Sequence, residues 1–198
     1  MVDNSLSLKF VAPSWGDIEE LSYRIAKQII DRKIQIDSIV AILRGGWIPA
    51  RIIADLLGIE EIGVLGIKFY KSIETRKEQP IITHPLILDI HDKNVLVVDD
   101  VADTGKSLSI AIELIRLYGP RNLYTATIYV KPASIFTPDF YAETTNAWII
   151  FPWEKAELAR EYSSGKISEN LLLEMRKQAG LDIEKVKRIA RLVRRGNT

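Results

Sequence analysis

Cysteine is absent from this chain of 198 residues, so disulfides, thiolate metal ligands and cysteine nucleophiles are all excluded. Histidine occurs only twice, and neither His84 nor His91 has a sequence neighbour at metal-ligand spacing. An excess of charge of one sign is also missing, because the formal net charge at pH 7 is +1. The chain therefore has no overall attraction to nucleic acid or to an anionic membrane.

Long hydrophobic runs are missing as well. No apolar run reaches the length of about eighteen residues that a membrane-spanning helix needs. The first ten residues, MVDNSLSLKF, lack the apolar core of a signal peptide, so we expect a cytoplasmic protein. A hydrophobic content of 47% over 198 residues suits one globular domain with a sizeable core, with room for an appendage.

Apolar segments with strand character alternate with segments of helical periodicity. Strands are predicted over residues 38–43, 62–70, 95–98, 123–130 and 147–151. Helices are predicted over residues 14–31, 48–57 and 107–118, the first of them with Ser14 as its N-cap and Asp17 three residues later. The alternation predicts an α/β fold, with a mainly parallel central sheet and helices on both of its faces.

The most informative stretch is residues 95–107, VLVVDDVADTGKS. Its apolar beginning predicts a buried strand, and its last residues, from Thr104 to Ser107, predict the first turn of a helix. Between them stand three carboxylates, Asp99, Asp100 and Asp103. A glycine-bearing turn at the carboxyl end of a parallel strand aims backbone N–H groups at phosphate, while carboxylates suit hydroxyls and a metal. The stretch therefore predicts a site for a sugar phosphate.

Two other interpretations of this stretch stand beside that one. Gly105-Lys106-Ser107 looks like the end of a nucleotide-binding P-loop, but the first glycine of that motif would fall at Asp100. A carboxylate there would repel a triphosphate, which disfavours an ATPase. The second interpretation is a turn that binds no ligand and uses Thr104 as the N-cap of the helix. Because three carboxylates within five residues repel one another, a metal, a sugar or a cation is the more economical explanation.

Three further segments place glycines, a cation or aromatic residues at or after predicted strands. Arg44, Gly45 and Gly46 follow the strand over 38–43, and there a cation and glycine amides can approach an anion closely. Lys131 follows the strand over 123–130 and begins the tripeptide Lys-Pro-Ala, and residues 147–153 read AWIIFPW. Taken alone, each segment is equally compatible with an ordinary turn, a surface lysine or a core tryptophan.

In their order along the chain, these segments resemble type I phosphoribosyltransferases. Residues 95–107 are similar to the family's loop for phosphoribosyl pyrophosphate (PRPP). The Arg44 segment is similar to its pyrophosphate loop, which in relatives has a non-proline cis peptide before the basic residue. The Lys-Pro-Ala and AWIIFPW segments, with the opening stretch 9–17, resemble the bacterial xanthine-guanine phosphoribosyltransferases. The resemblance covers about residues 8–153 and implies a small hood beside the central sheet.

The resemblance implies a role for each candidate residue. PRPP would be held at its 5′-phosphate and ribose by Asp99, Asp100, Ala102, Asp103, Thr104, Gly105, Lys106 and Ser107. Asp103 would be the catalytic residue, a proton acceptor near N7 of a purine. Arg44 and Gly45 would bind pyrophosphate, and Asp99 and Asp100 would bind Mg²⁺, directly or through water. The purine would meet Lys131 at O6, Trp148 across its ring and the backbone of Ile149 at C2.

Two stretches of the candidate site differ from the family pattern or have two interpretations. Lys106 and Ser107 stand where the family pattern is often glycine and threonine, a change that keeps the helix start. Residues 71–80, KSIETRKEQP, predict either a solvated hairpin or a mobile lid, and their place resembles the family's flexible catalytic loop.

The resemblance ends near Glu154, which predicts a phosphoribosyltransferase domain over residues 1–153 and a helical C-terminal extension over 154–198. Helices are predicted in the extension over about 154–162, 168–178 and 183–194. The last of them is strongly basic, with Glu184 as its one acid. A helix docked on this chain or on a second subunit is the favoured interpretation, and a nucleic-acid-binding module is the alternative.

We therefore expect a Mg²⁺-dependent purine phosphoribosyltransferase of nucleotide salvage. It would convert PRPP and hypoxanthine, guanine or xanthine into the nucleoside monophosphate and pyrophosphate, as a homodimer or homotetramer. One alternative is a phosphoribosyltransferase for adenine or another base. The other is a PRPP- or purine-sensing regulator without catalysis, against which Asp103, Arg44 and Lys131 argue. Neither a membrane nor nucleic acid is expected as a partner.

Overall fold

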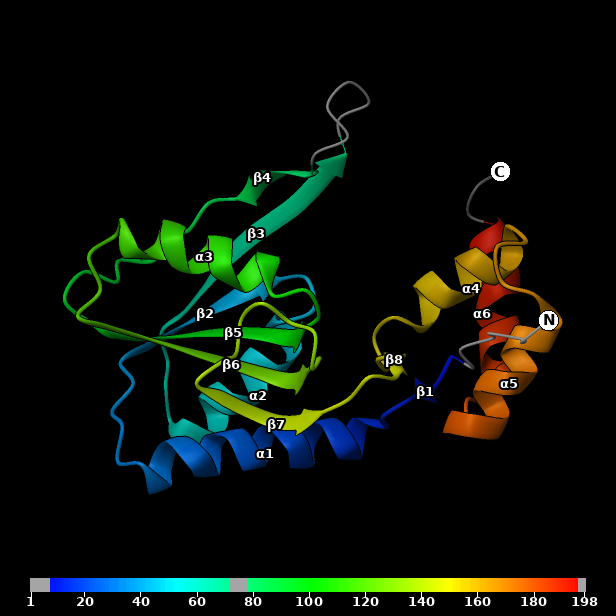
Figure 1. Ribbon diagram of the computed structural model, residues 1–198, viewed down its shortest axis with the longest axis horizontal. Coiled ribbons are helices and arrows are strands. Elements are labelled where there is room, and N and C mark those ends of the chain that lie inside the picture. Colours follow the sequence, from blue (N-terminus) through cyan, green and yellow to red (C-terminus); the bar gives the residue numbers. More distant parts are fainter. Residues whose placement is uncertain (1–7, 72–77, 196–198) are drawn as a thin grey trace, which may run out of the picture. The chain divides into compact units, whose positions relative to one another are not determined.

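The computed structural model describes residues 8–71 and 78–195 (Figure 1). The chain divides into two compact units, one formed by Ile18–Thr145 and the other by Met1–Asp17 with Asn146–Thr198. The units divide the chain after Asp17 and after Thr145, and the predicted domain boundary between residues 153 and 154 stays a prediction. Six residues of the predicted lid, 72–77, lie outside the described residues.

The larger unit is built on a six-stranded sheet in the order β4-β3-β2-β5-β6-β7. Its strands are β2 (Ser38–Leu43), β3 (Ile62–Lys71), β4 (Glu78–His84), β5 (Asn94–Ala102), β6 (Asn122–Val130) and β7 (Phe140–Thr144). Every neighbouring pair is parallel except β3 and β4, which are antiparallel at one edge. The predicted α/β class and mainly parallel sheet are therefore confirmed.

Three helices cover the two faces of this sheet. They are α1 (Trp15–Asp31), α2 (Trp47–Leu57) and α3 (Lys106–Arg116). α1 and α2 lie on one face and α3 on the other, so both faces of the central strands are buried (Figure 1). No helix in the described part of the chain combines the length and the low polarity that a membrane span needs.

The predicted start of α1 is confirmed in its hydrogen bonds. The Asp17 N–H donates to Oγ of Ser14 at 3.1 Å, and the Ser14 N–H donates to Oδ2 of Asp17 at 2.8 Å. Further along, α1 buries one apolar stripe, Ile18, Leu21, Ile25 and Ile29. The reciprocal cap satisfies backbone donors that the first turn would otherwise leave without a partner.

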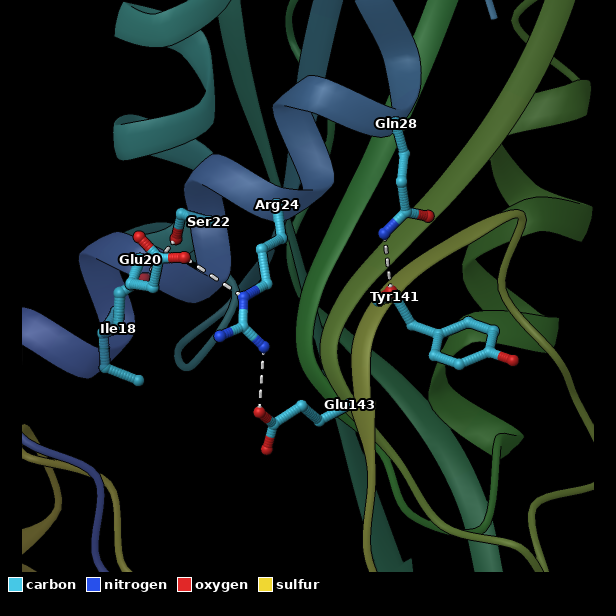
Figure 2. A network of polar contacts seen from close by, with 7 residues as sticks. All are labelled: Ile18, Glu20, Ser22, Arg24, Gln28, Tyr141 and Glu143. Atoms are coloured by element: carbon cyan, nitrogen blue, oxygen red, sulfur yellow. Dashed lines mark hydrogen bonds and ion pairs between the residues drawn. The ribbon is translucent and has the colours of Figure 1, made fainter. Parts of the chain in front are cut away.

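Strand β7 was not predicted, and polar contacts tie it to α1 (Figure 2). The Gln28 amide donates to the Tyr141 carbonyl at 2.9 Å, and the Arg24 guanidinium pairs with Glu143 at 3.2 Å. Glu20 also pairs with Arg24, at 3.2 Å along the same helix. Only Phe140 is buried within β7, so the strand lacks the apolar pattern that reveals the inner strands.

The predicted strand over 147–151 is only partly confirmed. Strand β8 (Trp148–Ile149) is two residues long and pairs in parallel with β1 (Phe10–Val11), in a small sheet separate from the central one. A continuous apolar run does not distinguish a strand from a buried irregular segment, and Pro152 has no N–H to extend the ladder.

The predicted C-terminal helices are present, with boundaries shifted by one residue. They are α4 (Lys155–Ser163), α5 (Glu169–Ala179) and α6 (Ile183–Arg195). Ser168 caps α5 by accepting the Leu171 N–H at 3.2 Å, and Asp182 accepts the Lys185 N–H at 2.9 Å at the start of α6. The apolar side of α6 is buried against α4, α5 and β1, in one cluster with Leu172. The helix therefore finds its apolar partner inside its own unit.

Two adjacent leucines on α5 test how far this cluster stabilises the protein. Leu172 is fully buried in it, whereas Leu173 is 48% exposed. We expect Leu172→Ala to lower the free energy of unfolding by about 2–5 kcal/mol, because it leaves a cavity in packed surroundings. Leu173→Ala is the matched control and should change that free energy by less than about 0.5 kcal/mol. Equal losses in the two variants, measured by urea denaturation, would contradict this packing.

Candidate functional site

The carboxyl end of β5 carries the two acidic residues at the centre of the predicted site. Asp99 and Asp100 are each 8% exposed. Side chains alternate along a strand, so Asp99 follows Val95 and Val97 onto the face that α3 covers, and Asp100 points to the other face. The Asp100 N–H donates to Oδ1 of Asp99 at 3.0 Å.

Burial sets the charge state of the Asp99 carboxyl. Loss of solvent raises the pKa of Asp99 well above its ordinary value, and the neighbouring charge of Asp100 raises it further. The hydrogen bond from the Asp100 N–H acts in the opposite direction. A cation, or hydroxyl donors, bound at these carboxylates would relieve the cost of keeping them charged.

We expect Asp99→Asn to raise the melting temperature of the ligand-free protein at neutral pH. A carboxyl whose pKa is raised by folding stabilises the protein below its unfolded pKa, and this contribution is lost as the pH rises through the folded pKa. Asparagine does not titrate, so the advantage of the variant should grow as the pH rises from about 4. If the melting temperature of Asp99→Asn stays at or below that of the wild type up to pH 8, folding does not raise the pKa of Asp99.

Asp92 offers a control of opposite sign. Arg121 contacts both of its carboxylate oxygens at 3.0 Å and lowers the pKa of Asp92. A lowered pKa stabilises the folded state above the unfolded pKa, and that stability is lost as the pH falls. Asp92→Asn should therefore lower the melting temperature slightly at neutral pH and leave it unchanged in acid. Asparagine also suits the positive φ of 55° at this position.

The Arg44 segment lies directly against the end of β5. The peptide bond between Leu43 and Arg44 is cis, as the resemblance implies. A methyl group added to Gly45 would overlap the Asp100 carboxylate, and one added to Gly46 would overlap the Val98 carbonyl. At Gly46 a side chain would meet backbone atoms, and at Gly45 it would displace the Asp100 carboxylate. The backbone that follows Arg44 and the carboxylate of Asp100 therefore share one end of the sheet.

The loop after β5 turns into α3 through Gly105. This residue has φ 79°, and a side chain there would lie 2.6 Å from Oγ of Ser134. Gly105 is the cap of α3 and has no side chain that could accept an N–H of the first turn, while the Thr104 hydroxyl accepts the Lys106 N–H at 3.4 Å. The predicted cap at Thr104 therefore lies one residue too early, and the interpretation without a ligand stays a prediction. A helix start of this kind suits an anionic group.

Backbone hydrogen bonds join the segment after β6 to the loop between β5 and α3. The Lys131 N–H donates to the Ala102 carbonyl at 3.0 Å, and the Ile135 N–H donates to the Thr104 carbonyl at 3.1 Å. Burial lowers the pKa of Lys131, and the charge of Asp103 acts in the opposite direction. The structure thus brings Lys131 close to Asp103, as the resemblance implies.

Ser134 and the following turn were not predicted to support the candidate site. The Ser134 hydroxyl donates to the Phe136 carbonyl at 2.8 Å, and this turn packs against Gly105. Its sequence signal is weak, because a serine between alanine and isoleucine marks no particular turn. The contact depends on the pairing of β5 with β6, which brings the ends of both strands together.

Trp148 and Ile149 belong to the other unit. The Trp148 side chain is 61% exposed, although Ile150 and Phe151, which follow Ile149, are buried. A small cavity of about 110 Å³ lies beside it, lined by Trp148, Ile149, Ile150, Glu154, Glu157, Leu158 and Glu161. An indole that keeps an open face can stack on a planar ligand. The predicted purine contacts of Trp148 and Ile149 stay predictions.

The donor set at the end of β5 fits one kind of metal. Among the described residues, no group of three or more histidine, aspartate or glutamate side chains is arranged to hold an ion. Two adjacent carboxylates suit Mg²⁺, which keeps several waters and is usually bound by one or two carboxylates together with substrate phosphates. They do not suit a structural zinc site, which requires four protein ligands.

Comparison with known proteins gives consistent results. A family model described as the phosphoribosyl transferase domain matches residues 14–159. A xanthine-guanine phosphoribosyltransferase of Gluconobacter oxydans is 27% identical over 154 residues, which are 77% of this chain and 89% of the relative. One from Cereibacter sphaeroides is 34% identical over 121 residues, 60% of this chain and 70% of the relative. The crystal structure of a purine phosphoribosyltransferase from Pyrococcus horikoshii superposes with a TM-score of 0.68 at 36% identity, covering 74% of this chain and 94% of that one.

Proposed function

This chain belongs to the phosphoribosyl transferase domain family, and from that premise we propose that it is a Mg²⁺-dependent purine phosphoribosyltransferase of nucleotide salvage. It transfers 5-phosphoribosyl from PRPP to hypoxanthine, guanine or xanthine. One observation carries the proposal: the Arg44 loop, the Asp99–Asp100 pair and the loop before α3 lie together at the carboxyl end of the two central strands, β2 and β5. These three features match the pyrophosphate, the ribose and the 5′-phosphate of PRPP.

In this proposal, the two ends of PRPP are bound by different backbone segments. The 5′-phosphate accepts hydrogen bonds from the Thr104 hydroxyl and from the backbone N–H groups of Gly105, Lys106 and Ser107 at the start of α3. The pyrophosphate is bound by the Arg44 guanidinium and the Gly45 N–H. The backbone at Ala102 is held by Lys131 and fixes where the phosphate loop begins.

The Asp99 and Asp100 carboxylates would hold Mg²⁺, directly or through water, and the ribose hydroxyls. Their burial and mutual repulsion favour a bound cation. When bound, the ion would neutralise charge on the departing pyrophosphate. The protein's own share of this work is to fix the position of the sugar, because each carboxylate lies at the end of a rigid strand.

The reaction forms a bond from a purine nitrogen to C1 of the ribose and breaks the bond from C1 to the pyrophosphate oxygen. Positive charge develops on the ribose in an oxocarbenium-like transition state, as in glycoside hydrolysis. The purine then carries one proton too many, and Asp103 accepts it near N7. The cationic Arg44 stabilises the negative charge of the departing pyrophosphate, and the α3 amides stabilise that of the 5′-phosphate, which stays on the ribose.

Lys131 selects the base. An ammonium only donates hydrogen bonds, so it fits a carbonyl at position 6 of the purine and disfavours the amino group of adenine. Partial burial of Lys131 strengthens the penalty for a mismatched donor. Trp148 would stack on the ring, and the backbone of Ile149 would meet the group at C2. Assembly as a homodimer or homotetramer and a cytoplasmic location are proposed on the resemblance.

The deciding experiment is turnover of a nucleobase panel with PRPP and Mg²⁺, followed by pyrophosphate release. We expect activity with one or more 6-oxopurines and little or none with adenine or pyrimidines. Turnover restricted to adenine or to a pyrimidine would refute the proposed base. Tight PRPP binding without turnover of any base would favour the sensing regulator instead.

A further inference from the structure

Two buried threonines follow one another on the same face of β6. Thr125 is 2% exposed and Thr127 is fully buried. They alternate with Ala126 and Ile128, so both point to the face that α3 covers, with Leu123 of the same strand. The two side chains share a strand and a face, but they differ in their hydrogen bonds.

Thr125 is fully engaged by a carboxylate. Its hydroxyl donates to Oδ2 of Asp139 at 2.7 Å, and its N–H donates to the same oxygen at 2.8 Å. The Asp139 N–H returns a hydrogen bond to the Thr125 hydroxyl at 3.0 Å. This closed set of contacts explains why a polar residue is tolerated inside the sheet.

The Thr127 hydroxyl, in contrast, has no hydrogen-bond partner among the residues that the structure describes. A buried hydroxyl without a partner destabilises the fold, and valine has the same shape without that cost. A threonine at this position therefore needs an explanation outside the stability of the ligand-free fold.

The nearest acidic neighbour of Thr127 by strand register is Asp99. The two residues are direct partners in the parallel pairing of β5 with β6, where Val97 is likewise the partner of Thr125. Neighbouring strands lie about 4.8 Å apart, and partners in register project on the same face. One oxygen of Asp99, Oδ1, accepts the Asp100 N–H at 3.0 Å, and the Asp100 side chain also interacts with this carboxyl in the ligand-free protein.

We propose that Thr127 is a positioning residue for Asp99, a role that rests on the proposed function. When PRPP and Mg²⁺ are bound, the Thr127 hydroxyl donates to the Asp99 carboxylate and fixes the rotamer that presents its other oxygen to the ribose or the ion. Carboxylates that bind a metal or a sugar are commonly held by such a hydrogen bond from behind. Thr127 itself touches neither substrate nor metal.

The test compares three variants in calorimetric titrations with PRPP and Mg²⁺ and in thermal unfolding of the free protein. Thr127→Val should weaken PRPP binding about tenfold and leave the melting temperature unchanged or raised. Thr127→Ser keeps the hydroxyl and should bind PRPP within about threefold of the wild type. Thr125→Val is the matched control: it removes the two contacts between the Thr125 hydroxyl and Asp139, so it should lower the melting temperature and leave PRPP affinity unchanged.

Wild-type affinity in Thr127→Val would overturn the proposal. So would an equal loss of affinity in Thr125→Val, because any change on this strand would then have the same effect. A lowered melting temperature in Thr127→Val with unchanged affinity would assign the hydroxyl a purely structural role. Failure of the proposed function is a different result, seen in the wild-type protein itself as absent PRPP binding or absent turnover of 6-oxopurines. Failure of the Thr127 role alone leaves both wild-type binding and wild-type turnover intact.

Discussion

Asp103→Asn should lower kcat about 10²- to 10⁴-fold while PRPP still binds. The substitution keeps the size of the side chain and removes the proton acceptor. Asp103 stands apart from the buried pair at the end of β5 and close to Lys131, so it is placed to meet the base instead of the sugar. Rapid-quench measurement of a single turnover, with PRPP affinity from calorimetry, separates the chemical step from binding.

A second consequence follows from the electrostatic effect of Asp103 on Lys131. The Asp103 charge raises the pKa of Lys131 against the effect of burial, so Asp103→Asn should lower that pKa further. The KM for the purine is therefore expected to rise modestly beside the large fall in kcat. Asp55→Asn is the control, because Asp55 pairs with Arg51 on the exposed side of α2, and this variant should keep full activity. Near-wild-type kcat in Asp103→Asn would remove Asp103 from the catalytic role.

The inner strands and the phosphate loop could be predicted because their causes are local. Val95–Val98 is apolar on both faces, which marks a strand buried from two sides. The glycine at position 105 has a positive φ that other residues rarely adopt, so the turn into α3 is readable from its sequence. Helix α1 could also be predicted, because its N-cap and its apolar stripe lie within one continuous segment of the sequence.

The edge strands could not be predicted from the same pattern. β4 contains Pro80, which lacks the N–H of a central strand and is acceptable here because β4 lies at an edge. β7 buries only Phe140 and is stabilised by contacts with α1, from residues more than a hundred positions away. Pairing with distant residues leaves no periodic signal in the strand itself.

The assembly of the site also depends on the strand order. β2 and β5 are neighbours in the sheet although α2, β3 and β4 separate them along the chain. Because the two strands are adjacent, Gly45 lies against Asp100, and the sequence of neither segment predicts this contact. The resemblance implies that the Arg44 loop and the loop after β5 act together. The geometry gives the physical reason for glycine at position 45, because a side chain there would overlap the Asp100 carboxylate.

Lys131→Ala should lower kcat/KM for hypoxanthine and guanine about 10²-fold, while PRPP affinity changes less than about threefold. A hydrogen bond from a charged donor to a carbonyl, in a site that excludes water, is worth about 1.5–3 kcal/mol. The Lys131 side chain follows β6, where its own N–H is held by the Ala102 carbonyl, so its direction is set by the sheet. Removal of the ammonium should also narrow the preference for 6-oxopurines over adenine, because the donor that opposes an amino group is gone.

Lys93 provides the matched control for this prediction. It lies just before β5, at the opposite end of the sheet from the candidate site, and its ammonium pairs with Glu61 at 2.6 Å. Lys93→Ala removes the same charge and should leave kcat/KM for every base unchanged. An equal loss in both variants would trace the effect to net charge and not to recognition of O6. Unchanged kcat/KM in Lys131→Ala would place this side chain outside the purine site, and base selection would then have to come from other residues.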